Sequence, residues 1–194
     1  IHASSHVSAS YDFSGLSIIG AGTVQLKSGI TFSNMTFSSC DEIPAAGATI
    51  SSCIFNNSIG TGSLNVTTSS QTETISSCTF TGNPYAIRLT NSTAETYTFN
   101  NLQFSANTSD VYVAATTGTT TINVINGGDT PTYTSAGSTV VINNNKSLTI
   151  EIRDADGALI TSACEITVVK ADDVTVLYQV ENVTTGTTLY TYSY

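Results

Sequence analysis

Residues 49–55 read Thr-Ile-Ser-Ser-Cys-Ile-Phe, and residues 74–80 read Thr-Ile-Ser-Ser-Cys-Thr-Phe. Both stretches carry one pattern: an apolar residue, two polar residues, a second apolar residue, one further residue, and a Phe. Self-similarity of this kind is the sequence signature of repeat folds, in which each repeat packs on its neighbours. The two stretches therefore predict a repeat protein.

The pattern continues on both sides of these two stretches, and a degraded sixth copy begins near Ile122. The first positions of successive copies are 19, 18, 25, 24 and 23 residues apart. The five clear copies are Phe13/Leu16/Ile18, Phe32/Met35/Phe37, Ile50/Cys53/Phe55, Ile75/Cys78/Phe80 and Phe99/Leu102/Phe104.

A second, strictly alternating apolar pair lies between the copies and is flanked by Gly, Ser, Thr or Asn. Strict alternation is typical of a half-buried strand, so each repeat should hold two or three short strands joined by turns. These pairs are Val24/Leu26, Leu64/Val66, Ile87/Leu89, Val111/Val113 and Val140/Ile142.

Stacking the repeats would align their apolar positions in internal rows, with like residues about 4.8 Å apart. The two-residue gap inside each copy indicates a bend between two strands, with both flanking side chains pointing inward. We therefore expect an all-β chain: residues 1–145 form a right-handed parallel β-helix of about six coils. The competing interpretation of this region is a β-sandwich of alternating strands.

Residues 146–194 follow a different pattern of alternating strands and acidic turns, and predict a small antiparallel β-sandwich. Its first strand alternates Leu148, Ile150 and Ile152, and its last alternates Tyr190, Tyr192 and Tyr194. Few strands fit into this length, so the sandwich is either incomplete or finished by a neighbouring subunit across an open edge.

Residues 148–164 resemble the opening of carboxypeptidase-regulatory-like or transthyretin-like β-sandwich modules, which run strand, Asp-x-x-Gly turn and short bridge. A Ser/Thr/Asn-rich β-helix that leads into such a module resembles structural proteins of tailed phages. The resemblance implies a non-enzymatic structural, decoration or fibre component, located at a virion surface or outside the cell. Its partners would be other copies of itself and other virion or surface proteins.

Two other functions stay open. A bacterial surface adhesin or glycan-binding protein can share the architecture, with glycans as partners of tyrosines and polar side chains on the outer faces. The less favoured reading is a polysaccharide-cleaving enzyme. The distribution of charges, with a net charge of −9 and five Lys and Arg residues, disfavours nucleic-acid binding and membrane insertion.

No catalytic, cofactor-binding or metal residue is predicted, and no cofactor is expected. Glu73 and Glu95 precede two copies of the pattern at similar offsets, but solvated turn residues explain them better than a glycosidase carboxylate pair. Arg88 is the only Arg of the coils, and the sequence offers no acidic ladder beside it, as a lyase would need.

Two further clusters are weak metal candidates. Asp154, Asp156 and Gly157 match part of a calcium loop, but the remaining ligands are missing and a hairpin turn accounts for them. His2 and His6 have no carboxylate between them.

The cysteines, Cys40, Cys53, Cys78 and Cys164, fit no zinc or redox spacing. Buried free thiols are the favoured interpretation, and disulfides in an oxidising setting are the alternative.

Overall fold

The computed structural model describes residues 13–151, 153–158, 164–169, 176–183 and 187–193. The chain divides into two compact units, residues 1–144 and residues 145–194.

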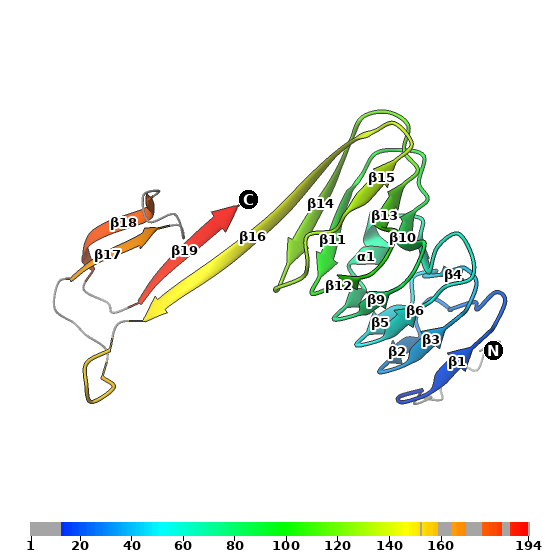
Figure 1. The fold of residues 1–194 in the computed structure, drawn as a ribbon, viewed down its shortest axis with the longest axis horizontal. Helices are drawn as coiled ribbons and strands as arrows, with labels where there is room; N and C mark the ends of the chain where they lie inside the picture. The colour runs from blue at the N-terminus through cyan, green and yellow to red at the C-terminus, as the bar shows by residue number, and fades with distance from the viewer. Residues whose placement is uncertain (1–12, 152, 159–163, 170–175, 184–186, 194) are drawn as a thin grey trace. The chain divides into compact units, whose positions relative to one another are not determined.

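The first unit is a β-solenoid of about six turns whose short strands form three parallel sheets (Figure 1). Sheet A consists of β1 (Ser17–Ile19), β3 (Thr36–Ser38), β6 (Ile54–Asn56), β9 (Thr79–Thr81) and β12 (Gln103–Ser105). Sheet B consists of β2 (Thr31–Ser33), β5 (Thr49–Ser51), β8 (Ile75–Ser76), β11 (Thr96–Asn100), β14 (Thr119–Ile125) and the first part of β16 (Thr139–Glu151). Sheet C consists of β4 (Ile43–Pro44), β7 (Leu64–Val66), β10 (Tyr85–Leu89), β13 (Ser109–Val113) and β15 (Tyr133–Ser135).

The strand register confirms that equivalent apolar residues of successive repeats stack on each other. Ile50 is the register partner of Ile75 in sheet B, and Phe55 is the partner of Phe80 in sheet A. A one-residue slip would turn these side chains to the outside, so the inward rows fix the register. The parallel solenoid is therefore observed, while its right-handed sense stays a prediction.

Two boundaries of the repeat differ from the sequence prediction. The sixth copy starts at Val124 and not near Ile122, because Val124 pairs with Phe99 whereas Ile122 pairs with Tyr97. Val140 and Ile142 do not continue the alternating pairs of sheet C, since Ile142 pairs with Ile122 in sheet B. The alternation in β16 fits a strand of sheet B or of sheet C equally well. Its pairing with β14 places it in sheet B.

The predicted bend inside each copy is a corner between sheet B and sheet A, made by one residue in the left-handed region. Six equivalent described residues hold it, with φ between 51° and 76°. Four of the six are Asn or Gly, which enter this region more readily than most residues. The six residues are Gly15, Asn34, Ser52, Ser77, Asn101 and Asn126.

A second left-handed corner follows sheet A in the same way, two residues after the third apolar position of each copy. It sends the chain towards sheet C with φ between 51° and 67°. The residues there are Gly20, Ser39, Asn57, Gly82 and Ala106. Because the two corners recur at the same phase, each turn repeats the path of the one before.

The core of the first unit contains a column of stacked rings from the third apolar position. The ring centroids lie 4.9 Å apart for Phe37 and Phe55, 5.0 Å for Phe55 and Phe80, and 5.6 Å for Phe80 and Phe104. The middle rings are fully buried, whereas Phe104 at the end of the column is only partly buried. At the opposite end Leu16 is 46% exposed, because the first described turn has no turn beneath it in the described residues.

A four-residue helix, α1 (Ser69–Thr72), replaces part of a strand in the turn that contains β8. The sequence analysis did not predict it. The Thr72 hydroxyl accepts a hydrogen bond from the backbone N–H of Thr98 at 3.1 Å, in the place where a neighbouring strand would accept it. The helix thus shortens β8 without leaving that amide of β11 without a partner.

The described residues of the second unit form two antiparallel strand pairs. Residues 145–151 of β16 pair with β19 (Thr187–Ser193), and β17 (Cys164–Val169) pairs with β18 (Val176–Val183). These pairs agree with the expected hairpin strands, but the β-sandwich stays a prediction. Ile152 and Tyr194 lie outside the described residues.

The ring column gives a graded prediction for stability. Replacing Phe80 by Ala removes two ring contacts and opens a cavity, and should cost about 3–5 kcal/mol of unfolding free energy. Replacing Phe104 by Ala should cost clearly less, since that ring has one neighbour in the column and is partly exposed. Urea unfolding of the purified chain measures both. Equal losses for the two variants would show that the column is not the packing unit.

Candidate functional site

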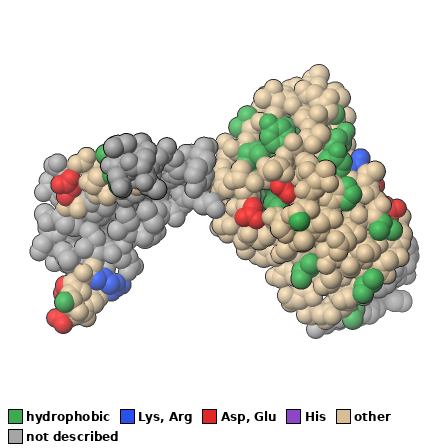
Figure 2. Space-filling model, viewed as in Figure 1, with side chains coloured by type: hydrophobic (Ala, Val, Ile, Leu, Met, Phe, Trp, Pro, Cys, Tyr) green, Lys and Arg blue, Asp and Glu red, His purple; other side chains and the backbone are tan. Residues whose placement is uncertain are grey.

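The outer faces of sheets A and B carry mainly Ser, Thr and Asn, interrupted by the exposed residues Ile19, Ile54, Ile125 and Val141. The outer face of sheet C carries charged and aromatic side chains. In sheet C the outward residues Asn65, Arg88 and Tyr112 are register partners on three successive turns. Figure 2 shows that the visible face of the first unit is mostly neither hydrophobic nor charged. Sheet C is therefore the part of the described surface where a specific polar site is best developed.

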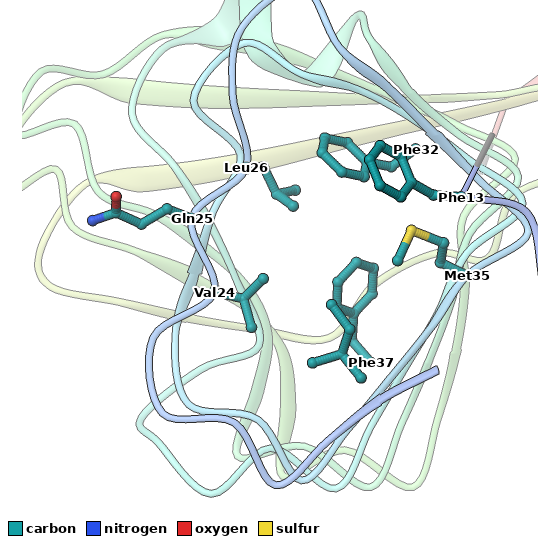
Figure 3. A pocket seen from close by; sticks show the side chains of 8 residues that line it. Phe13, Val24, Gln25, Leu26, Phe32, Met35 and Phe37 are labelled. Atoms are coloured by element: carbon teal, nitrogen blue, oxygen red, sulfur yellow. The ribbon is translucent and has the colours of Figure 1, made fainter. Parts of the chain in front are cut away.

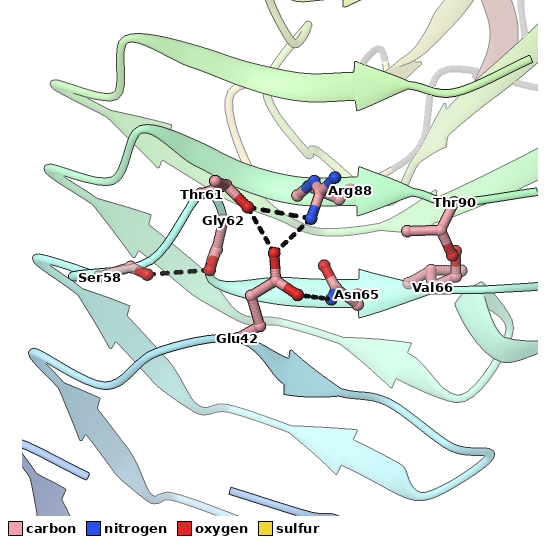
Figure 4. Close-up of polar contacts among 8 residues, drawn as sticks. All are labelled: Glu42, Ser58, Thr61, Gly62, Asn65, Val66, Arg88 and Thr90. Atoms are coloured by element: carbon pink, nitrogen blue, oxygen red, sulfur yellow. Dashed lines mark hydrogen bonds and ion pairs between the residues drawn. The ribbon is translucent and has the colours of Figure 1, made fainter. Parts of the chain in front are cut away.

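Four residues of sheet C and its preceding loop form one hydrogen-bonded cluster, which we call the Glu42 clasp: Glu42, Thr61, Asn65 and Arg88 (Figure 4). Arg88 forms an ion pair with Glu42, and the Thr61 hydroxyl donates to the same carboxylate oxygen. The Asn65 amide donates to the other oxygen at 2.8 Å, and Arg88 Nη1 donates to Thr61 Oγ1 at 3.0 Å. The clasp joins three turns of the solenoid.

A glycine makes room for the Arg88 side chain. A Cβ at Gly62 would lie 2.4 Å from Arg88 Cδ, so the aliphatic part of Arg88 rests directly on the Gly62 backbone. The Ser58 hydroxyl donates to the Gly62 carbonyl at 2.9 Å and holds this loop in place. The loop 58–62 thus positions both Thr61 and Arg88.

Two tyrosines lie beside the clasp, Tyr112 on the next turn and Tyr85 on the same strand as Arg88. The Arg88 Cζ atom lies 5.5 Å from the centroid of the Tyr112 ring, a cation–π distance. The Tyr85 ring lies 5.2 Å from the same ring with a tilt of 47°. Arg88 is therefore held by a carboxylate on one side and an aromatic ring on the other.

The environment of Glu42 favours its charged form. The hydrogen bond from Thr61 lowers the pKa of Glu42 most, and Asn65 and Arg88 lower it further, against a smaller opposing effect of burial. The side chains of Arg88 and Glu42 are 24% and 34% exposed, so solvent screens the pair. The clasp is therefore an ion pair near the surface, with Glu42 in its charged form at neutral pH.

Two buried atoms of the clasp have no hydrogen-bond partner among the described residues, the acceptor Asn65 Oδ1 and the donor Arg88 Nε. Most buried polar atoms in proteins are satisfied by protein or by water. An acceptor and a donor in the same cluster are the groups that a hydroxyl could bridge.

Glu73 and Glu95 were predicted to be solvated turn residues, with a glycosidase carboxylate pair as the alternative. The structure gives the two side chains different surroundings. Glu73 is exposed at the end of α1. Glu95 accepts from the Ser69 backbone N–H at 2.6 Å and from the Asn91 side chain at 2.5 Å. One oxygen of Glu95 thus fastens two turns together, and the other accepts from its own turn. Arg88 was predicted to lack an acidic ladder beside it, and its acidic neighbour is Glu42, from a turn two below its own.

The acidic turn of the second unit has the geometry of a hairpin turn. Asp154 Oδ1 accepts from the backbone N–H groups of Asp156 at 3.0 Å and Ala158 at 2.9 Å, and Gly157 has a φ of 83°. One carboxylate oxygen is thereby engaged by the backbone. Among the residues that the structure describes, no group of three or more His, Cys, Asp or Glu is arranged to hold a metal ion. His2 and His6 lie outside those residues.

Cys40, Cys53 and Cys78 are buried free thiols, the favoured interpretation of the sequence. The Cys53 thiol donates to the Phe32 carbonyl of the preceding turn at 3.5 Å. The hydrogen bond with Cys53 and burial both raise the pKa of the Cys78 thiol, which keeps it protonated. Cys53 and Cys78 occupy the second apolar position of their copies, whereas Cys40 lies just after the second corner. The side chain of Cys164 lies outside the described residues.

Sequence reasoning missed an internal polar ladder beneath the second corner. Asn83, 1% exposed, donates to the Phe55 carbonyl of the preceding turn at 3.1 Å and to Asn107 Oδ1 at 3.1 Å. Asn107 donates in turn to the Phe80 carbonyl at 3.1 Å and to Asp110 at 2.9 Å. The signal was present, because Asn83 and Asn107 each follow a left-handed residue at the same distance from the Phe of their repeat.

The last turns are closed by two further carboxylates. Asp110 Oδ2 accepts from the backbone N–H of Thr132 at 2.8 Å and from its hydroxyl at 2.7 Å. Asp129 Oδ2 accepts from the backbone N–H of Phe104 at 2.9 Å, on the edge of β12. A carboxylate at that position occupies the edge of sheet A, where another strand could otherwise pair.

The first turns contain an apolar hollow at the end of the core (Figure 3). Phe13, Leu26, Phe32 and Met35 point into it, while the Gln25 side chain points away. The described residues that line the hollow are apolar except for Gln25, and none of them has an ionisable side chain.

The chain has no match among protein-family models, curated proteins or solved structures. None of the described helices has the length and apolar character that crossing a membrane requires.

The clasp predicts a dependence of stability on pH. The pKa of Glu42 is lowered on folding, so its contribution is present above the ordinary carboxyl pKa and is lost as pH falls through the folded value. Glu42→Gln should therefore lower the unfolding free energy at neutral pH by at most about 1 kcal/mol, as for exposed pairs.

Urea unfolding over a series of pH values measures this difference, which should disappear in acid. Glu73→Gln is the control, because Glu73 is exposed. A gap between wild type and Glu42→Gln that stays constant at every pH would contradict the assignment.

Proposed function

We propose that this chain is a non-enzymatic structural component of an extracellular assembly such as a phage virion, in which it serves as a decoration or fibre element. The observation that carries the proposal is the use of the carboxylates in the coils. Four of the six carboxylates within residues 13–145 accept hydrogen bonds from another turn of the solenoid, namely those of Glu42, Glu95, Asp110 and Asp129. A carboxylate that accepts hydrogen bonds from a neighbouring turn serves to hold the solenoid together. The two carboxyl groups of a glycoside hydrolase must instead face the substrate.

The stacked core supports the same proposal. Rows of matching side chains and rings give a rigid rod of short strands, and its outer faces consist mainly of uncharged hydroxyl and amide groups. Such faces suit packing against sister subunits and neighbouring surface proteins. The proposal includes a right-handed winding and a C-terminal β-sandwich of the carboxypeptidase-regulatory-like or transthyretin-like kind.

Labelling of intact particles tests this role. Gold-conjugated antibodies raised against the purified chain should decorate the exterior of phage particles made by a virus whose genome encodes it. Detection of the chain only in the soluble fraction of lysed cells, with bare particles, would refute the virion assignment. Assays for polysaccharide cleavage, by reducing ends and by unsaturated-uronate absorbance, should stay at background.

Glycan binding is the second candidate, and one observation favours it. The Glu42 clasp and the adjacent Tyr85 and Tyr112 place a carboxylate, a guanidinium and two phenol rings on the outer face of sheet C. Such groups can donate to and accept from sugar hydroxyls, and their charges balance within the cluster, which suits a neutral saccharide.

A glycan array probed with the full chain and with Arg88→Ala separates the two candidates. Binding to neutral glycans that is lost in Arg88→Ala would favour the second function. Thr79→Ala, on the outer face of sheet A, is the matched control and should bind as wild type does. The structural role predicts no signal above background for any of the three proteins.

A further inference from the structure

The only Asn-Gly dipeptide of the chain is Asn126–Gly127, directly after β14 in the last turns of the solenoid. Both residues are exposed, and both lie in the left-handed region, with φ of 55° and 82°. Asn126 occupies the corner position that Ser77 and Asn101 hold in earlier turns, since Asn101 donates to the Ile125 carbonyl as Ser77 does to that of Asn100.

We propose that Asn126 is a site of spontaneous deamidation that unfastens the last turn of the solenoid. The backbone nitrogen of Gly127 attacks the side-chain carbonyl carbon of Asn126, and a C–N bond forms while the bond to Nδ2 breaks. Ammonia leaves, and the five-membered succinimide remains. Water then adds to either carbonyl of the ring and gives Asp or isoaspartate, with no oxidant, reductant or other co-reactant.

The attacking nitrogen is accessible. No hydrogen bond from the Gly127 amide is found among the described residues, whereas the next amide, that of Gly128, donates to the Ile125 carbonyl at 3.3 Å. Nothing lies within 4 Å of the position that a Cβ of Gly127 would occupy. Among the described residues, the leaving amide of Asn126 makes one hydrogen bond, which it donates to Asn100 Oδ1 at 2.8 Å on an exposed face.

Two other asparagines, Asn57 at the second corner and Asn107 directly after it, are each followed by an amide that is engaged in a hydrogen bond. In Asn57–Ser58 the following amide donates to Asn83 Oδ1 at 3.0 Å, and in Asn107–Thr108 it donates to the Asn83 carbonyl at 2.9 Å. In both cases the nucleophile is held in a hydrogen bond and the next residue carries a side chain. These two dipeptides are internal controls within the same molecule.

The consequence follows from what comes immediately after Gly127. Gly128 packs so closely that a Cβ there would lie 3.1 Å from the Leu102 nitrogen, and Asp129 donates from its backbone to the Leu102 carbonyl at 2.9 Å. Isoaspartate inserts one methylene into the backbone ahead of both residues. The Asp129 carboxylate is then displaced from the Phe104 amide, and the edge of β12 is exposed.

Peptide mass mapping of the purified full chain, aged in mildly alkaline buffer, tests the site. Deamidation replaces an amino group by a hydroxyl group and so raises the mass of the peptide. This mass increase should appear at least about tenfold faster in the peptide with Asn126 than in the peptides with Asn57 and Asn107. That factor corresponds to a barrier difference of about 1.4 kcal/mol. Equal rates at the three sites would overturn the proposal.

Two variants make the result specific. Asn126→Ser keeps a residue type that the same corner accepts at Ser52 and Ser77, and it should remove the modification from this peptide while the fold is kept. Asn126→Asp supplies the product with the normal backbone. Hydrogen exchange at the Phe104 amide should be faster in aged wild type than in either variant. Unchanged exchange in a fully isoaspartyl sample would refute the unfastening.

Discussion

Contact between like side chains on successive turns is the interaction on which the rest of this structure depends. Each turn has only short strands and too few apolar residues to form a core alone. Ile50 on Ile75, and Phe55 on Phe80, supply that core only when the turns are in register. The left-handed corners matter because they return the chain to the same phase at each turn, so that every inward side chain meets its counterpart.

The inward rows were predictable from sequence because their spacing is fixed by a corner of constant length. Phe32/Met35/Phe37 and the later copies keep that spacing, whereas the rest of each turn varies in length. The sixth copy was misplaced because polar and glycine residues replace its second and third hydrophobes, so that only pairing with Phe99 identifies Val124. The short helix α1 carries no apolar period, and it was therefore invisible in the sequence.

The polar contacts were less predictable than the core because they join residues from different turns. Arg88 and Glu42 are 46 positions apart in the sequence. To predict their contact, one must know the spacing between turns along the solenoid as well as the order of the turns. In the polar ladder, Asn83 and Asn107 each lie three residues after the Phe of their turn, and Asp110 joins them from the turn of Asn107. In a solenoid, buried amide side chains as well as buried rings can recur at a fixed position in each turn. Candidate polar contacts can therefore be found by comparing residues at the same offset in successive turns.

The constant corner between sheets B and A also separates the parts of each turn that can change from those that cannot. Turn length grows from 18 to 25 residues while this corner keeps its two residues, so the added length falls in the connections that enter and leave sheet C. Loop 58–62 and helix α1 are such additions. Insertions at these connections can therefore add new outer surface. The corner between sheets B and A, and the inward rows that it aligns, can stay unchanged while they do so.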